Sequence, residues 1–327
     1  MHNFLKKKFQ FIQAIRDFFI ENGFTDVLVP PMVSHPGIEP HIHPFKVSPS
    51  LSSSQNKNQG LFLHSSPEFF MKELLSQGME KIFTLSHSFR DEPSSSIHRN
   101  QFIMLEWYRS GSHYTDIMDD CTKLWVYLNE KFLGRTPIEK VHTLTIAEVF
   151  KRHLNIDILD LLKIDDLKKV IKNSFPEIPI PEGRDEDKMT WDDYFFLLFL
   201  NKVEPCLKQY PFLILYEFPY HLSALSTLKE SDPRVCERFE VYIEGVELAN
   251  CFNELCDLKT QKKRAEKDLK LKEDLYHYSL PAPYTLFRSL EKGLPPSAGI
   301  ALGLERLFSI ITKEENPFLD TDSIFQN

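Results

Sequence analysis

Helical and extended patterns follow one another irregularly along this chain of 327 residues. Strand-like apolar runs are expected at residues 27–29, 82–89, 102–108, 212–217, 238–243, 246–255 and 299–302. Amphipathic patterns predict helices at residues 5–22, 66–75, 114–132, 260–278 and 304–311, with several more between 143 and 204. Because strands do not alternate regularly with helices, the order favours an antiparallel sheet with helices packed on it, the α+β class.

Composition narrows the class of protein further. Apolar residues make up 42% of the chain, which is ordinary for a globular protein and excludes a disordered one. The net charge of −8 disfavours non-specific nucleic-acid binding, because neutralising phosphates needs clustered Lys and Arg. Five cysteines without CxxC spacing support neither a disulfide framework nor a zinc site. With no signal-peptide pattern and no apolar run long enough for a bilayer, we expect a cytoplasmic protein without membrane contact.

Three segments carry the strongest functional signal, although neither GxGxxG nor GxxxxGK[ST] is present. They are Gly23–Met32, then Phe89-Arg90-Asp91-Glu92 with His98–Phe102, and Gly299–Arg306, which reads GIALGLER. In this order they resemble the three signature motifs of class II aminoacyl-tRNA synthetases. The resemblance implies one catalytic domain over residues 1–327, an antiparallel sheet flanked by helices, with a mainly helical insertion at about 143–205. It also implies a homodimer, since motif one forms a dimer interface in this family.

Further segments resemble the lysyl branch of the class. They are Ser65–Glu68, Met104–Arg109, Arg238–Tyr242 and Gly245–Asn250. Together they are similar to the elongation factor P–lysine ligases, stand-alone relatives of lysyl-tRNA synthetase. Motif one begins almost at residue 1, which leaves no room for an anticodon-binding domain, and Ala301 stands where synthetases carry Gly. The resemblance implies ATP-dependent activation of lysine or (R)-β-lysine as an aminoacyl-adenylate and transfer to a lysine of elongation factor P.

The same resemblance implies a site for ATP and Mg²⁺. Arg90 and Arg306 would be the catalytic residues, Arg90 at the α-phosphate and the substrate carboxylate and Arg306 at the γ-phosphate. The planar guanidinium suits such oxygens because it binds two at once. The implied ATP-binding set is Arg90, Glu92, His98, Phe102, Glu247, Leu248, Gly303 and Arg306, with Phe102 stacked on adenine. Glu240 and Glu247 resemble Mg²⁺ ligands, and carboxylates with phosphate oxygens are what Mg²⁺ prefers.

A strand around Glu106 predicts a pocket for an ammonium group. Period-two alternation puts Phe102, Met104, Glu106 and Tyr108 on one face, and a lone Glu in the apolar run FIMLEWY is expected to be buried for a purpose. A carboxylate and an aromatic flank suit an aliphatic ammonium. The implied substrate-binding set is Ser66, Glu68, Glu106, Tyr108, Asn250, Glu254 and Ala301. Glu68 would take the amino group near the carboxylate, and Glu106, Tyr108 and Glu254 the distant ammonium.

Some features depart from a simple strand or from the family pattern. Strict alternation puts Asn250 and Glu254 on one face and Glu247 on the other, so we predict a bulge between 247 and 250. The ligases usually read HNPEF where this chain has His98-Arg99-Asn100-Gln101-Phe102. Cys251 replaces a Gly of the same family pattern.

Two other functions stay open at this point. One is a truncated lysyl-tRNA synthetase-like enzyme with another acceptor, either a small molecule or, less in keeping with the missing anticodon-binding domain, tRNA. The other is a non-catalytic regulator that binds ATP or an amino acid. The presence of Arg90, Arg306 and Glu247 favours an enzyme over a regulator.

Overall fold

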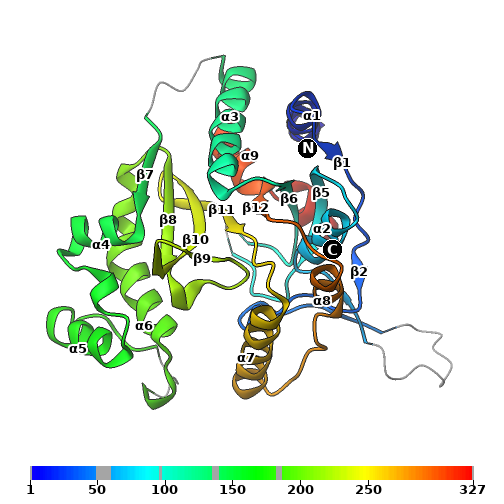
Figure 1. Ribbon diagram of the computed structural model, residues 1–327. Helices are drawn as coiled ribbons and strands as arrows, with labels where there is room; N and C mark the ends of the chain where they lie inside the picture. Colours follow the sequence, from blue (N-terminus) through cyan, green and yellow to red (C-terminus); the bar gives the residue numbers. More distant parts are fainter. Residues whose placement is uncertain (1, 49–59, 96–97, 135–139, 182–185, 326–327) are drawn as a thin grey trace. The chain divides into compact units, whose positions relative to one another are not determined.

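The structure, a computed structural model, describes residues 2–48, 60–95, 98–134, 140–181 and 186–325. Contacts divide the chain into two compact units, and Figure 1 shows their elements. The first unit comprises Met1–Pro137 and Glu254–Asn327, and the second comprises Ile138–Asn253. Within the described ranges, no helix is both long and apolar enough to span a membrane.

The first unit is built on a mainly antiparallel sheet. Its strands in spatial order are β1 (Thr25–Asp26), β5 (Lys81–Phe89), β6 (Gln101–Ser110) and β12 (Ser297–Gly303). β1 runs parallel to β5, and the pairs β5–β6 and β6–β12 are antiparallel. A small antiparallel sheet beside it holds β2 (Met32–Val33), β4 (Leu61–Leu63) and β3 (Lys46–Val47).

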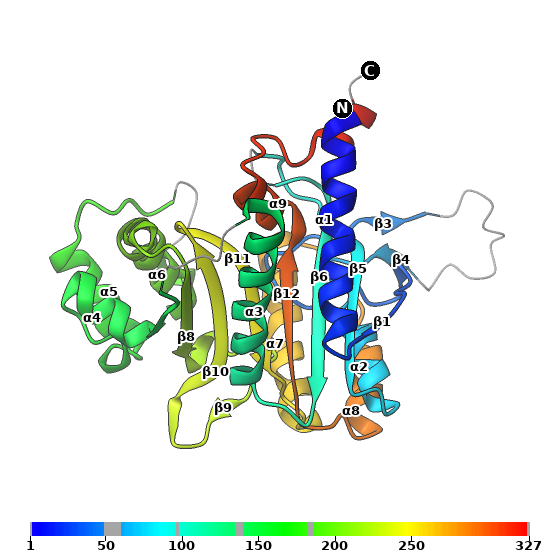
Figure 2. The same cartoon turned by 90° about the horizontal axis from the view of Figure 1, so that it is seen from above.

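Helices cover both faces of the larger sheet (Figure 2). On one face Phe19 packs on Phe83, with ring centroids 4.9 Å apart, and on Trp107 at 5.1 Å. The helices of that face are α1 (His2–Glu21), α3 (Tyr114–Leu133) and α9 (Leu304–Thr312). Those on the other side are α2 (Glu68–Ser76), α8 (Tyr284–Glu291) and α7 (Leu258–Tyr276), and the short α10 (Leu319–Phe325) follows α9. Even-numbered residues of β6 face α2, the side on which the ammonium pocket is predicted.

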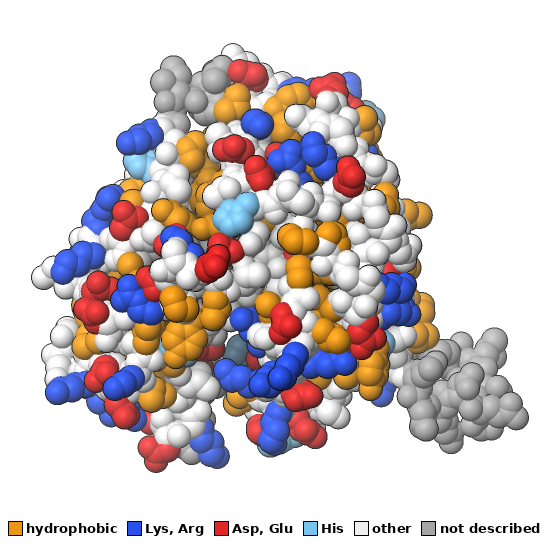
Figure 3. All heavy atoms as spheres, in the orientation of Figure 1, with side chains coloured by type: hydrophobic (Ala, Val, Ile, Leu, Met, Phe, Trp, Pro, Cys, Tyr) orange, Lys and Arg blue, Asp and Glu red, His pale blue; other side chains and the backbone are white. Residues whose placement is uncertain are grey.

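Helix α7 carries seven basic and four acidic side chains. Lys270 pairs with Asp274 one turn along, and Lys262 pairs with Glu291 of α8. Acidic and basic side chains both lie on the face shown in Figure 3, where blue side chains gather below the centre. The pattern fits the solvated helix face that Lys and Glu alternation indicates.

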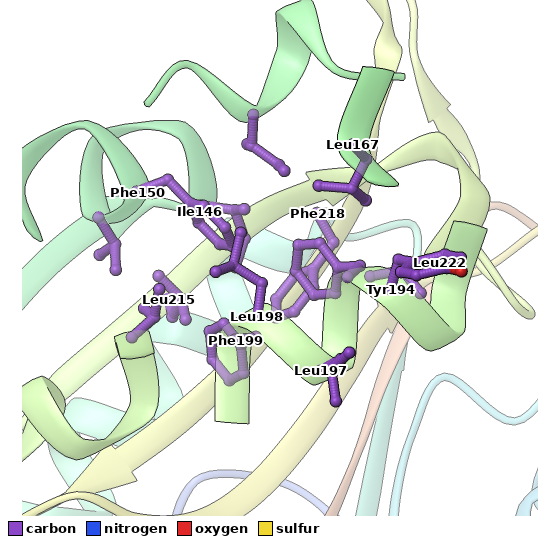
Figure 4. Packing of buried hydrophobic residues seen from close by; sticks show 14 of the residues in the cluster. Ile146, Phe150, Leu167, Tyr194, Leu197, Leu198, Phe199, Leu215, Phe218 and Leu222 are labelled. Carbon is purple, nitrogen blue, oxygen red and sulfur yellow. The ribbon is translucent and has the colours of Figure 1, made fainter. Parts of the chain in front are cut away.

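The second unit contains further strands and an apolar core. Its strands in spatial order are β11 (Val246–Asn253), β10 (Asp232–Ile243), β8 (Leu213–Pro219) and β7 (His142–Thr145), with β9 (Leu228–Lys229) on β10. Its helices are α4 (Ile146–Leu154), α5 (Ile164–Ser174) and α6 (Trp191–Leu198), which continues into the turns Phe199–Val203 and Glu204–Gln209. Figure 4 shows the apolar cluster that these helices form over β8, where Phe150, Phe199 and Phe218 are buried. Helices α4, α5 and α6 all lie within the segment 143–204, where the sequence predicts several helices.

The α+β prediction and most of the predicted elements are confirmed, with one clear error. Residues 27–29 are not a strand, because the pairing to β5 lies at Thr25–Asp26 and ends where the Val27 amide donates to the Phe83 carbonyl. The prolines that follow have no amide hydrogen to continue a ladder. Strands β10 and β11 form a hairpin about Glu244 and Gly245, and both residues have positive φ (51° and 80°), as a two-residue type I′ turn requires.

Candidate active site

A buried carboxyl group, Glu106, lies at the centre of the predicted ammonium pocket. Its Oε1 accepts a hydrogen bond from Ser66 Oγ at 2.5 Å, and its Oε2 accepts one from Tyr108 Oη at 3.1 Å. Burial, with help from the nearby charge of Glu68, raises the pKa of Glu106 to about 8. The group is therefore mainly protonated at neutral pH until a cation enters.

Lys72 joins two other carboxylates of the predicted set. Its Nζ lies 2.6 Å from Glu68 Oε1 and 2.6 Å from Glu254 Oε2, and its side chain is buried. Burial opposes the charged ammonium, but Glu254 and Glu68 outweigh it and raise the pKa of Lys72. Burial also raises the pKa of Glu254, to about 8. Sequence reasoning missed Lys72, although its position four residues after Glu68 on a helix was the available signal.

Small residues of β12 leave room beside these groups. In the β6–β12 register Gly299 lies opposite Tyr108, and Ala301 lies opposite Glu106. A Cβ at position 299 would come within 2.0 Å of the Tyr108 ring, so only glycine lets that ring lie against the strand. Ala301 is partly exposed, and its methyl group borders the space over Glu106.

Most of the residues predicted for ATP form a second cluster in the first unit. The Arg90 guanidinium lies over the Phe102 ring at 5.3 Å, and its Nε is buried without a hydrogen-bond partner among the described residues. His98 Nε2 is hydrogen-bonded to an Nη of Arg306, and burial together with that cation lowers the pKa of His98. Gly303 adjoins Arg306, because a Cβ there would lie 3.9 Å from the Arg306 Cδ.

The loop between Arg90 and Phe102 is held by Asn100, which sequence analysis counted only as a departure. Its side-chain amide donates to the carbonyls of Arg90 (3.0 Å) and Glu92 (2.9 Å). Its own carbonyl accepts from the Arg90 amide at 2.9 Å. These bonds fix the backbone at Arg90 and at Glu92. The buried Arg90 Nε, which has no hydrogen-bond partner among the described residues, is suited to bind an anionic ligand.

The remaining predicted residues lie in the second unit, on β10 and β11. The register shifts between Val241 and Tyr242, whose partners are Ala249 and Glu247, so Leu248 is the extra residue of a bulge. The predicted bulge is thereby confirmed. Because opposed residues share a face, Glu247 opposite Tyr242 and Asn250 opposite Glu240 point to the same side.

Glu240, a predicted Mg²⁺ ligand, is already hydrogen-bonded. Its Oε1 accepts from Arg238 at 2.6 Å and its Oε2 from Tyr242 Oη at 2.7 Å, while Arg238 Nε donates to Asn250 Oδ1 at 3.0 Å. Each carboxylate oxygen keeps a further lone pair. No group of three or more potential metal-ligating side chains occurs in the described ranges. Two carboxylates on one face fit Mg²⁺, which takes most of its ligands from phosphate and water.

Comparison with known proteins agrees with this geometry. The family model of class II tRNA synthetases (D, K and N) matches residues 1–316. The elongation factor P–(R)-β-lysine ligase of Vibrio atlanticus is 33% identical over 94% of this chain and 90% of its own length. The ligases of the same name from Vibrio cholerae and Salmonella paratyphi B are each 34% identical over 95% of this chain and 92% of their own. The chain therefore belongs to the class II tRNA synthetase family, together with these ligases.

Proposed function

We propose that this protein activates (R)-β-lysine or lysine with ATP and transfers the acyl group to a lysine of elongation factor P. The names of its relatives support the acceptor and the amino acid. The observation that carries the substrate class is the charge of the buried pocket. Among the described residues, Glu68 and Glu254 both contact Lys72, and Glu106 feels its charge, so these three carboxylates, when ionised, carry two more negative charges than Lys72 neutralises. A diamino acid brings two ammonium groups, which matches that deficit.

The reaction needs positioning and charge neutralisation more than proton transfer. A carboxylate oxygen of the amino acid attacks the α-phosphorus of ATP, and the bond to the bridging oxygen of pyrophosphate breaks. Arg90 would hold the carboxylate and the α-phosphate, and Arg306 the γ-phosphate. Mg²⁺ held by Glu240 and Glu247 would supply further neutralisation of phosphate charge.

The transfer step releases AMP. The acceptor amine attacks the acyl carbon of the adenylate, the carbon–oxygen bond to AMP breaks, and the amine loses a proton as the amide forms. Ala301 would favour a β-amino acid, because its methyl group narrows the space near the carbon that bears the amino group. We further propose that the protein acts as a homodimer in the cytoplasm.

The first experiment measures ATP–pyrophosphate exchange and AMP release with Mg²⁺ and L-lysine, (R)-β-lysine or (S)-β-lysine. Each reaction is run with and without elongation factor P, and the mass of the factor is determined. Exchange with (R)-β-lysine and a matching mass increase would support the ligase. Exchange without transfer would point to another acceptor, and ATP binding without exchange by the folded protein would leave the regulator.

Two variants sharpen the assignment of the amino acid. Arg90→Gln should abolish exchange, because it removes the buried orphan donor, while Arg234→Gln in the second unit should leave exchange unchanged. Ala301→Gly should shift preference toward L-lysine by about 10-fold or more, the scale on which one methyl group discriminates substrates. An unchanged ratio between the two amino acids would remove Ala301 from the specificity argument.

A further inference from the structure

One residue that departs from the ligase pattern, Arg99, is hydrogen-bonded to the segment that ends the described chain. Its Nε donates to Asp322 Oδ1 at 2.6 Å, and its Nη2 donates to Asp322 Oδ2 at 2.9 Å. The guanidinium lies over the Phe318 ring at 4.8 Å, and Asn316 also donates to Asp322, at 3.2 Å. Both charged side chains are only about one-fifth exposed (21% and 20%). A two-point ion pair that is mostly shielded from solvent fixes the orientation of the two side chains as well as their distance.

The other end of Arg99 holds the ATP loop. Its Nη1 donates to the carbonyl of His98 at 2.9 Å and to that of Ser95. His98 on one side is bonded to Arg306, and Asn100 on the other side ties the backbone of Arg90. Arg99 therefore lies in the chain between the residues that contact Arg306 and Arg90, and its guanidinium is shared between Asp322 and the loop carbonyls.

Helix α10 is itself fastened to the motif-three helix. Asp320 accepts from Lys8 Nζ at 2.9 Å, and the same Nζ lies 3.3 Å from Glu305 Oε1. Glu305 precedes Arg306 and accepts from the Ile103 amide at 3.0 Å. Two acidic residues of α10 are thus linked to the ATP cluster. Asp322 is linked through Arg99 to the loop, and Asp320 is linked through Lys8 to Glu305.

We propose that Asp322 is a positioning residue for ATP, acting through Arg99 to hold the loop 98–100 and, with it, the guanidinium groups of Arg90 and Arg306. This inference rests on the ATP roles given to those two arginines above. The alternative is that Arg99 matters only as a positive charge near the phosphates. The two readings predict opposite changes in ATP affinity for Asp322→Ala. Removing a negative charge near ATP by itself favours anion binding, whereas releasing the loop weakens it.

The test uses Asp322→Ala, Arg99→Gln and the double variant in the full chain. The matched control is Asp232→Ala, because Asp232 holds Arg234 in the same kind of fork (2.9 and 2.8 Å) in the second unit. Calorimetry gives the Kd for ATP, and pyrophosphate exchange gives the KM for ATP and for the amino acid. We expect Asp322→Ala to raise Kd and KM for ATP about 10-fold and the amino-acid KM less than about twofold. The double variant should bind ATP no more weakly than either single variant, because both substitutions break the same interaction.

Each outcome decides between the readings. Tighter or unchanged ATP binding by Asp322→Ala, an equal loss in the control, or an equal rise in the amino-acid KM would overturn the proposal. Failure of the proposed function is separable. If the wild-type protein binds ATP but catalyses no exchange, the proposed ligase function is wrong. The calorimetric comparison would still test the role of Asp322 in ATP binding. A wild-type protein that binds no ATP would reject both.

Discussion

Glu106 is a buried carboxyl group whose charge should depend on what shares its pocket. Burial raises the pKa of Glu106 to about 8. Below pH 8, binding of an ammonium group must therefore be accompanied by loss of the proton from the Glu106 carboxyl group. An aliphatic ammonium with an ordinary pKa near 10.4 stays charged over this range. We therefore expect kcat/KM for the amino acid to rise between pH 7 and pH 9. The pH profile of amino-acid-dependent pyrophosphate exchange measures it.

Glu106→Gln provides the control for that profile and a second readout. The variant should lose the share of the rise that Glu106 contributes, while Glu254, whose pKa is also about 8, keeps its own share, and it should lose most of its amino-acid affinity. In the unliganded protein a raised carboxyl pKa works against folding: the folded state holds the proton that the unfolded state releases, so stability falls as pH rises from about 4.5 to about 8. The melting temperature of Glu106→Gln relative to wild type should therefore increase over that window. A constant difference would mean that Glu106 titrates normally.

Lys72 should matter for both stability and substrate affinity. Lys72→Met leaves Glu68 and Glu254 buried without a cation, and breaking a buried pair costs about 3–5 kcal/mol in other proteins. We expect a lower melting temperature that partly recovers at acidic pH, where the two carboxyls take up protons. Lys270→Met removes the exposed pair with Asp274 at the same helical spacing and should change neither property. Equal melting temperatures for the two variants would contradict the role given to Lys72.

Secondary structure elements place the groups that single residues supply, and the β10–β11 hairpin is the clearest case. Its turn depends on Gly245, where φ is +80° and a Cβ would lie 2.6 Å from Lys208 Cγ and 3.2 Å from the Lys208 amide nitrogen. Gly245→Ala should lower the melting temperature of the protein. Gly293→Ala, with φ +93° and open space around it, carries the backbone cost alone, of order 1 kcal/mol. The prediction fails if differential scanning calorimetry finds the Gly245 variant no less stable than the Gly293 variant.

Elements with a strong local signal could be predicted from the sequence. The period-two row in β6 and the Glu244-Gly245 turn follow from local chemistry. The bulge at Leu248 follows from the family resemblance, which implies that Glu247 and Asn250 share a face. The short strands carry little local signal, since β1 has only two residues and its partner is more than 50 residues away. Its position was therefore misplaced within residues 27–29.

Side-chain networks were harder to predict than elements. Charge and spacing could suggest that Lys72 meets Glu68 on α2, but its bond to Glu254 depends on tertiary packing. The same holds for Arg99 and Asp322, which are separated by 223 residues. The sequence identified Arg99 only as a departure from a family pattern. Its acidic partner, Asp322, can be identified only from the fold, which brings α10 to the loop.

At the scale of the whole molecule, exposed apolar side chains gather in the N-terminal segment. Phe9 is 60% exposed, Ile20 54%, Leu28 95% and Met32 49%. Phe9 and Ile20 are eleven residues apart on α1, which is three helical turns, so they lie on one face. Leu28 and Met32 belong to the motif-one segment that follows the helix. A second copy of the chain is the partner that the family resemblance implies for this surface.

Leu28→Glu tests that assembly directly. A charge in the centre of an apolar interface must be desolvated without a partner, so we expect the variant to sediment as a single 38.3 kDa chain while the wild type sediments as a dimer. Leu200→Glu makes the same change at a position 51% exposed in the second unit and should stay dimeric. A monomeric wild type, or a Leu28→Glu variant that dimerises as tightly as the control, would show that the exposed leucine is not covered by a second copy.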